Sequence, residues 1–422
     1  MTTMDRSLAR YPIVAVGLTG AAFSAIKTGR DALFFSAAGI SELPIAYLLI
    51  ELGLTAGAWI HLGAMRRFGS RKTRVGVFLF SAVLFLAFVP FVGPGQRTLM
   101  RVLFPLVPTI FAALFAAAWL LAGDLLEGQN DLRLTQAYGY VGASAMFGGL
   151  AGAFAAKGLA QYLQPQSIIA CGSFLLIVCA LVCVQGHRAN RLQLMTQSQI
   201  RDASRTDRQK AIDTFQLLKV PYTRVLLAIS AFATVAAMYV EFQFYASAYN
   251  SGKGGAHFFA DYYIYLSGAS LLLQVLVAPR VQTRYGLSRA LIVLPIGIFG
   301  AAGMVAFTGS IVTQSILRVI ENSLKNSIHR SSWEQVFLRF NREQRAAVKV
   351  LIDGTVPRIA GIIGALALYG ALMFGGERAA IVSATWAAWA IIPIAIAWIS
   401  VTRLLDFPTT TGAACDIRVP DS

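Results

Sequence analysis

Long apolar runs alternate with short polar loops along most of the chain, with one polar stretch near the middle and a polar tail. Most runs hold about 20 largely apolar residues, the length that an α-helix needs to cross the hydrocarbon core of a bilayer. The pattern therefore predicts an all-α polytopic membrane protein with twelve transmembrane helices. These are expected at residues 11–30, 42–65, 75–94, 99–126, 136–161, 166–186, 225–248, 261–279, 288–308, 311–329, 347–373 and 379–402.

Composition agrees with this class, because 56% of the residues are hydrophobic and only 13% are charged. The formal net charge of +16 raises the question of nucleic acid, but the cations lie in short loops between apolar runs rather than on one domain. Cytoplasmic loops of membrane proteins carry such an excess of Lys and Arg. We therefore expect the lipid bilayer as surroundings and no nucleic-acid partner.

The distribution of loop cations also predicts the orientation. One side of the expected membrane holds Arg66, Arg67, Arg71, Lys72, Arg74, Arg280, Arg284 and Arg289, and the other holds little beyond Arg97, Arg101, Lys253 and Arg378. The positive-inside rule then places both termini in the cytoplasm, as an even number of spans requires. We expect a bacterial inner membrane as the location.

A basic polar linker divides the chain into two halves with similar loops. Arg67-Phe-Gly-Ser-Arg71 follows the second span, and Arg284-Tyr-Gly-Leu-Ser288 follows the eighth. Two six-helix halves in parallel repeat are the plan of major facilitator transporters, which hold substrate between the halves. The predicted parts are a half at 1–186, a cytoplasmic linker at 187–224, a half at 225–403 and a cytoplasmic tail at 404–422.

Glycines concentrate in one predicted span of each half. The span 136–161 contains Gly139, Gly142, Gly148, Gly149 and Gly152, and the span 347–373 contains Gly354, Gly361 and Gly364. Small residues allow helix backbones to approach closely in a membrane. We interpret these faces as structural, although they would also let one half rock on the other.

The end of the first span carries Lys27, Arg30 and Asp31. A charged side chain at the centre of a bilayer costs at least about 2.5–3.5 kcal/mol, so it persists mainly where it pairs or faces a water-filled cavity. This makes the three residues candidates for a substrate site. The alternative is that they mark the helix end, where long basic side chains reach the headgroups.

Further charges lie within or beside spans of the second half. Glu241 interrupts the span 225–248, and Asp353 and Lys349 lie near the start of the span 347–373. A stripe of charge at spacings of three and four shares one helix face, and it comprises Arg318, Glu321, Lys325 and His329. Neighbours of opposite sign can neutralise each other. Because apolar runs flank the stripe, it is expected to line an aqueous cavity rather than to be an ordinary solvated face.

Several short motifs in order resemble the ATP/ADP translocase family, the nucleotide transporters of plastids and intracellular bacteria with their bacterial relatives. The resemblance covers nearly all of the predicted spans. It rests on Gly29-Arg-Asp-Ala-Leu-Phe-Phe35, Leu43-Pro44, Gly123-Asp124, Tyr138-Gly-Tyr-Val-Gly142, Val240-Glu241, Asn322-Ser-Leu-Lys-Asn326, Arg345-Ala-Ala-Val-Lys349 and Ile352-Asp353.

The resemblance implies exchange of nucleotides across a membrane without ATP hydrolysis. By position it also implies substrate-handling roles for Arg30, Asp31, Glu241, Lys349 and Asp353. Triphosphates require several cations, because charge-assisted contacts to phosphate are among the stronger hydrogen bonds. The candidate cations are Lys27, Arg30, Lys325 and Lys349. The acids would hold these cations apart in the empty site or carry a coupling proton.

Other functions remain as alternatives at this stage. The first is a proton-coupled facilitator or exporter of another small metabolite, and the second is a membrane scaffold that binds a partner through the linker. An enzyme is not expected, since the chain lacks a phosphate loop ending in Lys-Ser/Thr and a Gly-x-Ser-x-Gly elbow. We expect no catalytic residues, metal or cofactor, and a monomer with a small anionic substrate, nominally a nucleotide.

Overall fold

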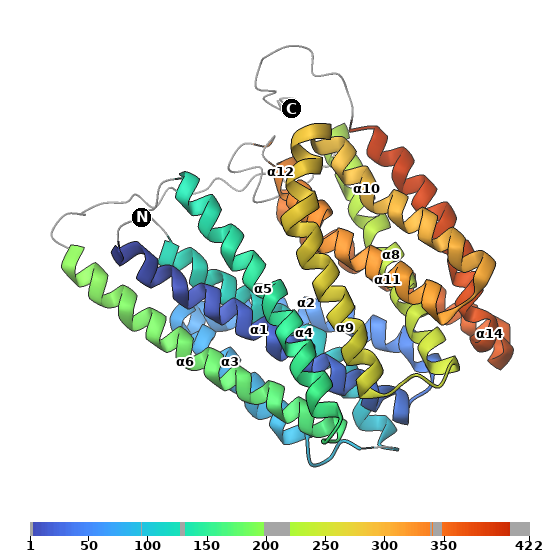
Figure 1. Ribbon diagram of the computed structural model, residues 1–422, viewed down its shortest axis with the longest axis horizontal. Helices are drawn as coiled ribbons and strands as arrows, with labels where there is room; N and C mark the ends of the chain where they lie inside the picture. Colours follow the sequence, from blue (N-terminus) through green and yellow to red (C-terminus); the bar gives the residue numbers. More distant parts are fainter. Residues whose placement is uncertain are drawn as a thin grey trace, which may run out of the picture. The chain divides into compact units, whose positions relative to one another are not determined.

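The computed structural model describes residues 3–93, 95–126, 131–197, 220–337, 340 and 348–405, and within these ranges all regular structure is helical (Figure 1). The α-helices are α1 (Thr3–Ala37), α2 (Leu43–Phe68), α3 (Ser70–Phe88), α4 (Arg97–Leu126), α5 (Asp131–Ala160), α6 (Pro165–Gln197), α8 (Pro221–Asn250), α9 (Ala256–Leu272), α10 (Ala278–Thr308), α11 (Ile311–Leu324), α12 (Arg330–Val336) and α14 (Val356–Arg403). The described residues also include three wider π-helical turns: η2 (Leu273–Val277) joins α9 to α10, η3 (Lys325–His329) joins α11 to α12, and η5 (Val350–Thr355) leads into α14. A short 3₁₀ turn, η1 (Ile40–Glu42), precedes α2.

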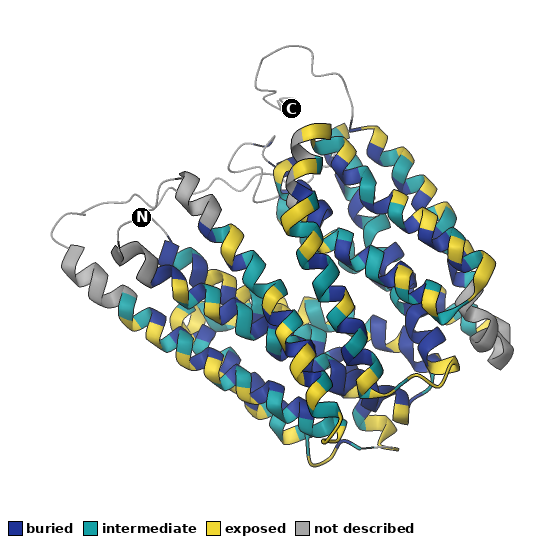
Figure 2. Cartoon of the chain, in the orientation of Figure 1, coloured by how far each residue is buried: buried dark blue, intermediate teal, exposed yellow. Residues whose placement is uncertain are grey.

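Among the described residues, ten helical segments are long and apolar enough to cross a membrane. The predicted spans at 75–94 and 311–329 are not among the ten, although helices α3 and α11 occupy these places. A multi-pass helical membrane protein is therefore supported, whereas the count of twelve spans remains a prediction. Large apolar side chains such as Trp59 and Ile60 of α2 are 73% and 71% exposed, as contact with lipid requires (Figure 2).

The first predicted span was too short at its end. Helix α1 continues to Ala37 rather than ending at residue 30, so the charged stretch lies inside the helix. Arg30 and Asp31 are 2% and 0% exposed. The alternative that these two charges mark a helix end at the headgroups is therefore wrong. The reason is that an apolar segment, residues 32–35, follows Asp31 and extends the buried face of the helix.

The boundaries of the predicted linker and tail are only partly described. Helix α6 runs to Gln197, so the first residues of the predicted linker 187–224 are helical. The remainder of that linker up to residue 219, and the predicted tail from residue 406, lie outside the described residues. The two predicted six-helix halves stay a prediction, because grouping by contacts does not test an internal repeat.

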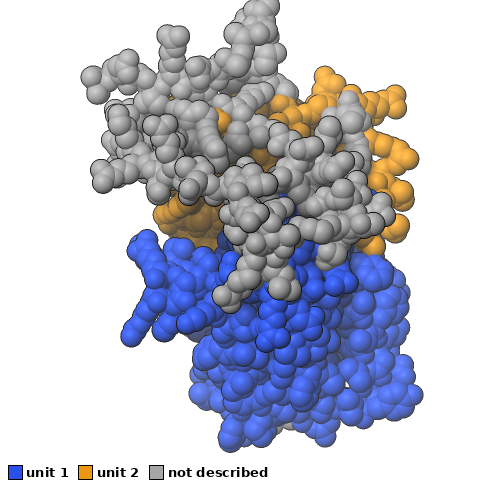
Figure 3. Space-filling view, turned by 90° about the vertical axis from the view of Figure 1, so that its left-hand side faces the viewer, with its two compact units in different colours: residues 1–42, 49–204, 253–268 blue, residues 43–48, 205–252, 269–422 orange. Residues whose placement is uncertain are grey.

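The chain groups into two compact units, coloured separately in Figure 3. Unit 1 comprises residues 1–42, 49–204 and 253–268, and unit 2 comprises residues 43–48, 205–252 and 269–422. The start of α9 thus belongs to unit 1, although it lies late in the sequence. In unit 1, helix α1 packs against α4, α5 and α6. In unit 2, α8 and α10 both pack against α14, and α11 packs against α8 and α10.

Small residues bring α1 and α5 into close contact in unit 1. A β-carbon on Gly148 would overlap the carbonyl oxygen of Gly17, and one on Gly152 would overlap the backbone of Ala21. The two α5 glycines are four residues apart and so share one helix face. The structural interpretation of these glycines agrees with this contact, which fixes the path of α1 and therefore the position of its charges.

We expect Gly148→Ala to destabilise unit 1 by at least about 1–3 kcal/mol, because a methyl group there forces the two backbones apart. Gly139→Ala is the matched control on the same helix, since nothing lies within 4 Å of a β-carbon at that exposed position. The measurement is thermal unfolding of both purified variants in detergent. Equal unfolding temperatures for the two variants would contradict the close contact between α1 and α5.

Candidate functional site

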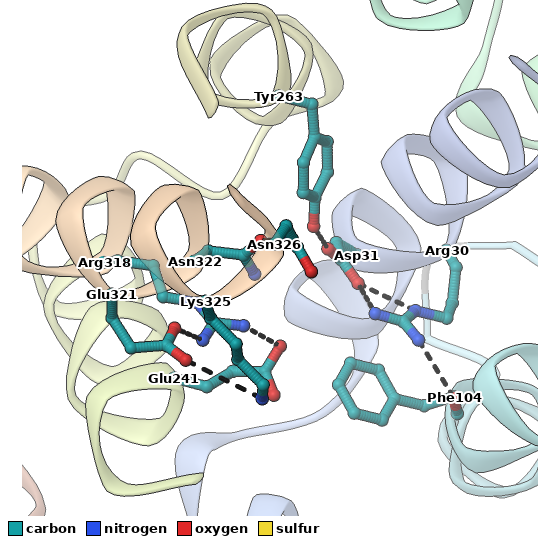
Figure 4. A network of polar contacts seen from close by, with 10 residues as sticks. All are labelled: Arg30, Asp31, Phe104, Glu241, Tyr263, Arg318, Glu321, Asn322, Lys325 and Asn326. Atoms are coloured by element: carbon teal, nitrogen blue, oxygen red, sulfur yellow. Dashed lines mark hydrogen bonds and ion pairs between the residues drawn. The ribbon is translucent and has the colours of Figure 1, made fainter. Parts of the chain in front are cut away.

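The first buried cluster of charge lies in unit 1, around the adjacent residues Arg30 and Asp31 of α1 (Figure 4). The guanidinium donates to Asp31 Oδ1 from Nε, at 2.7 Å, and also from Nη2. It donates from Nη1 to the carbonyl oxygen of Phe104 on α4, at 3.2 Å, and lies 4.1 Å from the centre of the Phe104 ring. Two hydrogen bonds to one carboxylate oxygen, together with the face of an aromatic ring, hold the Arg30 cation in one orientation.

Helix α9 supplies a second partner for the same carboxylate. The hydroxyl of Tyr263 donates to Asp31 Oδ2, and the ammonium of Lys27 lies 5.0 Å from the centre of the Tyr263 ring. Lys27 also lies 5.7 Å from the centre of the Phe23 ring. Cations are attracted to the faces of aromatic rings at such distances. Tyr263 therefore contacts both the acid and one of the bases in this cluster.

The second buried cluster lies in unit 2 and centres on Arg318 of α11. Its guanidinium contacts Glu241 Oε1 of α8 at 2.8 Å and Glu321 Oε2 of its own helix at 2.6 Å. Lys325, the first residue of η3, lies 3.8 Å from the other oxygen of Glu321. Figure 4 shows these four side chains directed toward one another. The group contains two acids and two bases and is neutral as a whole when all four are ionised.

The two acids of this second cluster differ in exposure. The side chain of Glu321 is 1% exposed and that of Glu241 is 24% exposed. The side chain of Lys325 is 45% exposed. Because charged side chains avoid hydrocarbon, the exposed part of Glu241 and Lys325 is expected to meet water inside the membrane. Arg318 is thus held by one enclosed carboxylate and one that water or a solute can reach.

Lys349 and Asp353, predicted to act with the other charges, have partners of their own. Lys349 pairs with Glu334 of α12 and lies 5.6 Å from the centre of the Phe337 ring. Asp353 accepts a hydrogen bond from Trp333 Nε1 at 2.8 Å. Among the described residues, the polar and aromatic contacts of Lys349 and Asp353 do not include Glu241 or Lys325. The structure therefore brings five of the seven predicted residues into two buried clusters and gives these two separate surroundings.

Sequence reasoning missed two important contacts. Tyr263 lies in the aromatic run Tyr262-Tyr-Ile-Tyr265, which carries no charge that would single it out, and Phe104 contributes a backbone carbonyl that no pattern reports. The sequence stripe did identify Arg318 and Glu321, but not as substrate residues. The described residues contain no group of three or more His, Cys, Asp or Glu side chains that could hold a metal ion.

Comparison with known proteins gives a fold rather than a family. No protein-family model and no curated protein matches the sequence. The solved nucleoside transporter NupG is similar in structure, with a TM-score of 0.67 and 10% identity, over 96% of this chain and 100% of that one. The xylose transporter XylE from E. coli, in a partially occluded inward-open conformation, has a TM-score of 0.65 and 12% identity, over 98% of this chain and 100% of that one. An auto-inhibited POT family peptide transporter has a TM-score of 0.64 and 11% identity, over 96% and 99% of the two chains.

The chain therefore has the fold of these transporters, and the predicted major facilitator-like fold is confirmed. The similar structures are a nucleoside, a xylose and a peptide transporter. The ATP/ADP translocase resemblance is not among these findings and remains a prediction.

Proposed function

We propose that the protein is a secondary-active transporter of a small anionic substrate, nominally a nucleotide, that works by exchange through alternating access. The observation that carries this proposal is the presence of two charged clusters that include ionisable residues on helices apolar enough to cross a membrane, the buried Arg30 and Asp31 on α1 and the partly buried Glu241 on α8. Burying such groups is costly, and intramembrane charges commonly mark substrate pathways. The alternative function, a membrane scaffold that binds a partner through the linker, does not require buried charges at these positions.

The chemistry of Arg318 supports an anion as substrate. Its guanidinium carries two carboxylates, of which Glu241 is the more exposed. A phosphate or carboxylate oxygen of a substrate can replace Glu241 while Glu321 stays in place, so Arg318 is never left unpaired. Lys325, nearly half exposed beside Glu321, would add a second cation to the same phosphate.

The net charge of the first cluster also supports an anionic substrate. Lys27 and Arg30 stand against Asp31, which leaves one positive charge in excess when all three are ionised. Within unit 1, this excess favours a negatively charged solute over a neutral or cationic one. The choice of a nucleotide and of exchange rests on the translocase resemblance, and the nucleoside transporter NupG lends a further analogy for a base-bearing cargo.

Asp31 favours a second candidate, proton-coupled transport of another metabolite. It is fully buried and bound by Arg30 and Tyr263, so adding a proton would release Arg30 from its ion pair. Protonation would thereby couple the proton gradient to the same cluster. The similar structures of sugar and peptide transporters supply analogies for a different cargo.

We expect purified protein in liposomes to take up labelled ATP and ADP when unlabelled nucleotide is present inside. Uptake is measured with and without internal nucleotide, and with and without an inward proton gradient. Liposomes without protein and liposomes with Arg318→Met serve as controls. The variant removes the cation that the proposal assigns to the substrate.

Each result distinguishes the two candidates. Uptake that depends on internal nucleotide supports exchange, and uptake driven by the proton gradient alone supports the second candidate. If folded protein transports no nucleotide under any condition, the nucleotide proposal is wrong. The search would then move to other anions under a proton gradient.

A further inference from the structure

The helix that carries the second cluster also carries a pair of neutral amides. Asn326 Nδ2 donates to Asn322 Oδ1 at 2.5 Å, and both side chains are drawn beside Lys325 in Figure 4. The two residues are four positions apart, so they share one face of the helix. The described contacts of these two side chains contain no other hydrogen bond.

This amide pair lies within a stretch that the sequence predicts to cross the membrane. Asn326 is exposed and Asn322 is half-buried. Exposed positions earlier on the helix are apolar, as at Val312 and Ile316, and suit lipid. Hydrocarbon does not satisfy the hydrogen bonds of an amide. The face with Asn322, Asn326 and the partly exposed Lys325 is therefore a polar face that requires water or a polar solute.

The bond between the amides leaves a specific pattern for a ligand. With Asn326 donating to Asn322, the Nδ2 hydrogens of Asn322 and the Oδ1 of Asn326 remain as an adjacent donor and acceptor. Amide side chains read nucleobase edges through paired contacts of this kind. A phosphate offers acceptors only, so it cannot satisfy the Asn326 oxygen. The pair suits an uncharged group with a donor beside an acceptor.

We propose that Asn322 and Asn326 bind the nucleobase of the substrate while Arg318 and Lys325 bind its phosphates. The inference rests on the proposed nucleotide transport and adds a recognition site for the uncharged end. Lys325 and Asn326 both lie in the π-helical turn η3, and such turns are frequent at functional sites. The wider turn places an ammonium and an amide on neighbouring positions of one helix.

The test compares ligands with and without a base on the purified full-length protein. Calorimetry measures the affinities for ATP, inorganic tripolyphosphate and ribose 5-phosphate in wild type and in Asn322→Ala/Asn326→Ala. We expect wild type to bind ATP more tightly than tripolyphosphate, and the double variant to bind ATP about 10- to 100-fold more weakly than wild type, as loss of two hydrogen bonds implies. Affinity for tripolyphosphate is expected to stay at the wild-type value.

Two controls separate recognition from folding. Ser315→Ala removes a polar group from the same helix that bonds only to the carbonyl of Ile311, and it is expected to leave all three affinities unchanged. If the double variant does not fold, Asn326→Ala alone is measured instead, because Asn326 is exposed. We expect this single variant to bind ATP more weakly than wild type, by a smaller factor than the double variant. The ratio of its affinity for ATP to its affinity for tripolyphosphate is then compared with the wild-type ratio, and a lower ratio in the variant supports base recognition.

Three results overturn the inference. Equal wild-type affinities for ATP and tripolyphosphate, or a double variant that keeps the wild-type preference for ATP, reject base recognition by the amides and leave the phosphate proposal standing. Ribose 5-phosphate that binds wild type as tightly as ATP assigns the amides to the sugar instead. Wild type that binds none of the three ligands rejects the proposed nucleotide transport, and the inference with it.

Discussion

Arg318→Met is expected to abolish nucleotide uptake and to destabilise unit 2 by about 3–5 kcal/mol, the usual cost of removing one partner from a buried ion pair. The variant removes the guanidinium that contacts both Glu241 and Glu321, and it leaves Lys325 beside Glu321. Two carboxylates in a poorly hydrated place repel each other, so the site changes shape as well as charge. Uptake in liposomes and thermal unfolding in detergent measure the two effects.

A second substitution distinguishes the loss of charge balance from the loss of a ligand. Arg318→Met/Glu321→Gln restores a neutral cluster, so we expect it to unfold closer to wild type than the single variant while still failing to transport. Arg330→Met is the matched control farther along the same helical stretch, because the Arg330 side chain is 64% exposed and its pair with Glu334 is screened by water. Wild-type uptake by the single variant would reject Arg318 as a substrate residue.

Arg30→Ala is expected to abolish uptake while the protein still enters the membrane, because removing a cation lowers the cost of insertion. The loss leaves Asp31 fully buried beside Tyr263 and without the two hydrogen bonds from Arg30. We expect a loss of stability of about 3–5 kcal/mol, as for other broken buried pairs. Membrane yield, thermal unfolding and uptake are the measurements.

Arg30→Lys and Lys349→Ala serve as comparison variants for the loss of uptake in Arg30→Ala. Lysine keeps the charge but cannot reproduce the two bonds to Asp31 with the planar contact to Phe104, so we expect it to restore activity only in part. Lys349→Ala removes a half-exposed cation paired with Glu334, and it is expected to keep the wild-type unfolding temperature and to reduce uptake less than Arg30→Ala does. Wild-type uptake by Arg30→Ala would remove the first cluster from the proposed site.

The membrane class and the position of the unusual charges could be predicted from the sequence. Both depend on local properties, because the length of an apolar run and the cost of a charge within it do not require knowledge of distant partners. The spacing of the stripe around Arg318 and Glu321 likewise identified the helix face that carries the second cluster. The similar loops at residues 67–71 and 284–288 favoured the fold that the similar solved structures share.

The identity of the partners depended on the tertiary structure. The carbonyl of Phe104 is 74 positions from Arg30, and Tyr263 is 232 positions from Asp31, so no local pattern connects them. The end of α1 also depended on packing, because burial of the following apolar residues continued the helix past two charges. The tertiary structure likewise supplied the partners of two predicted site residues, because Lys349 pairs with Glu334 and Asp353 accepts a hydrogen bond from Trp333.

The sequence by itself therefore determined that costly charges interrupt or adjoin long apolar segments, since hydropathy and charge are read directly from the residues. Only the tertiary structure decided which of those charges pair with one another. It also decided that the side chain of Glu241 stays 24% exposed while it contacts Arg318. Electrostatic stabilisation depends on distance and burial, and folding sets both by bringing together helices that are far apart in the chain.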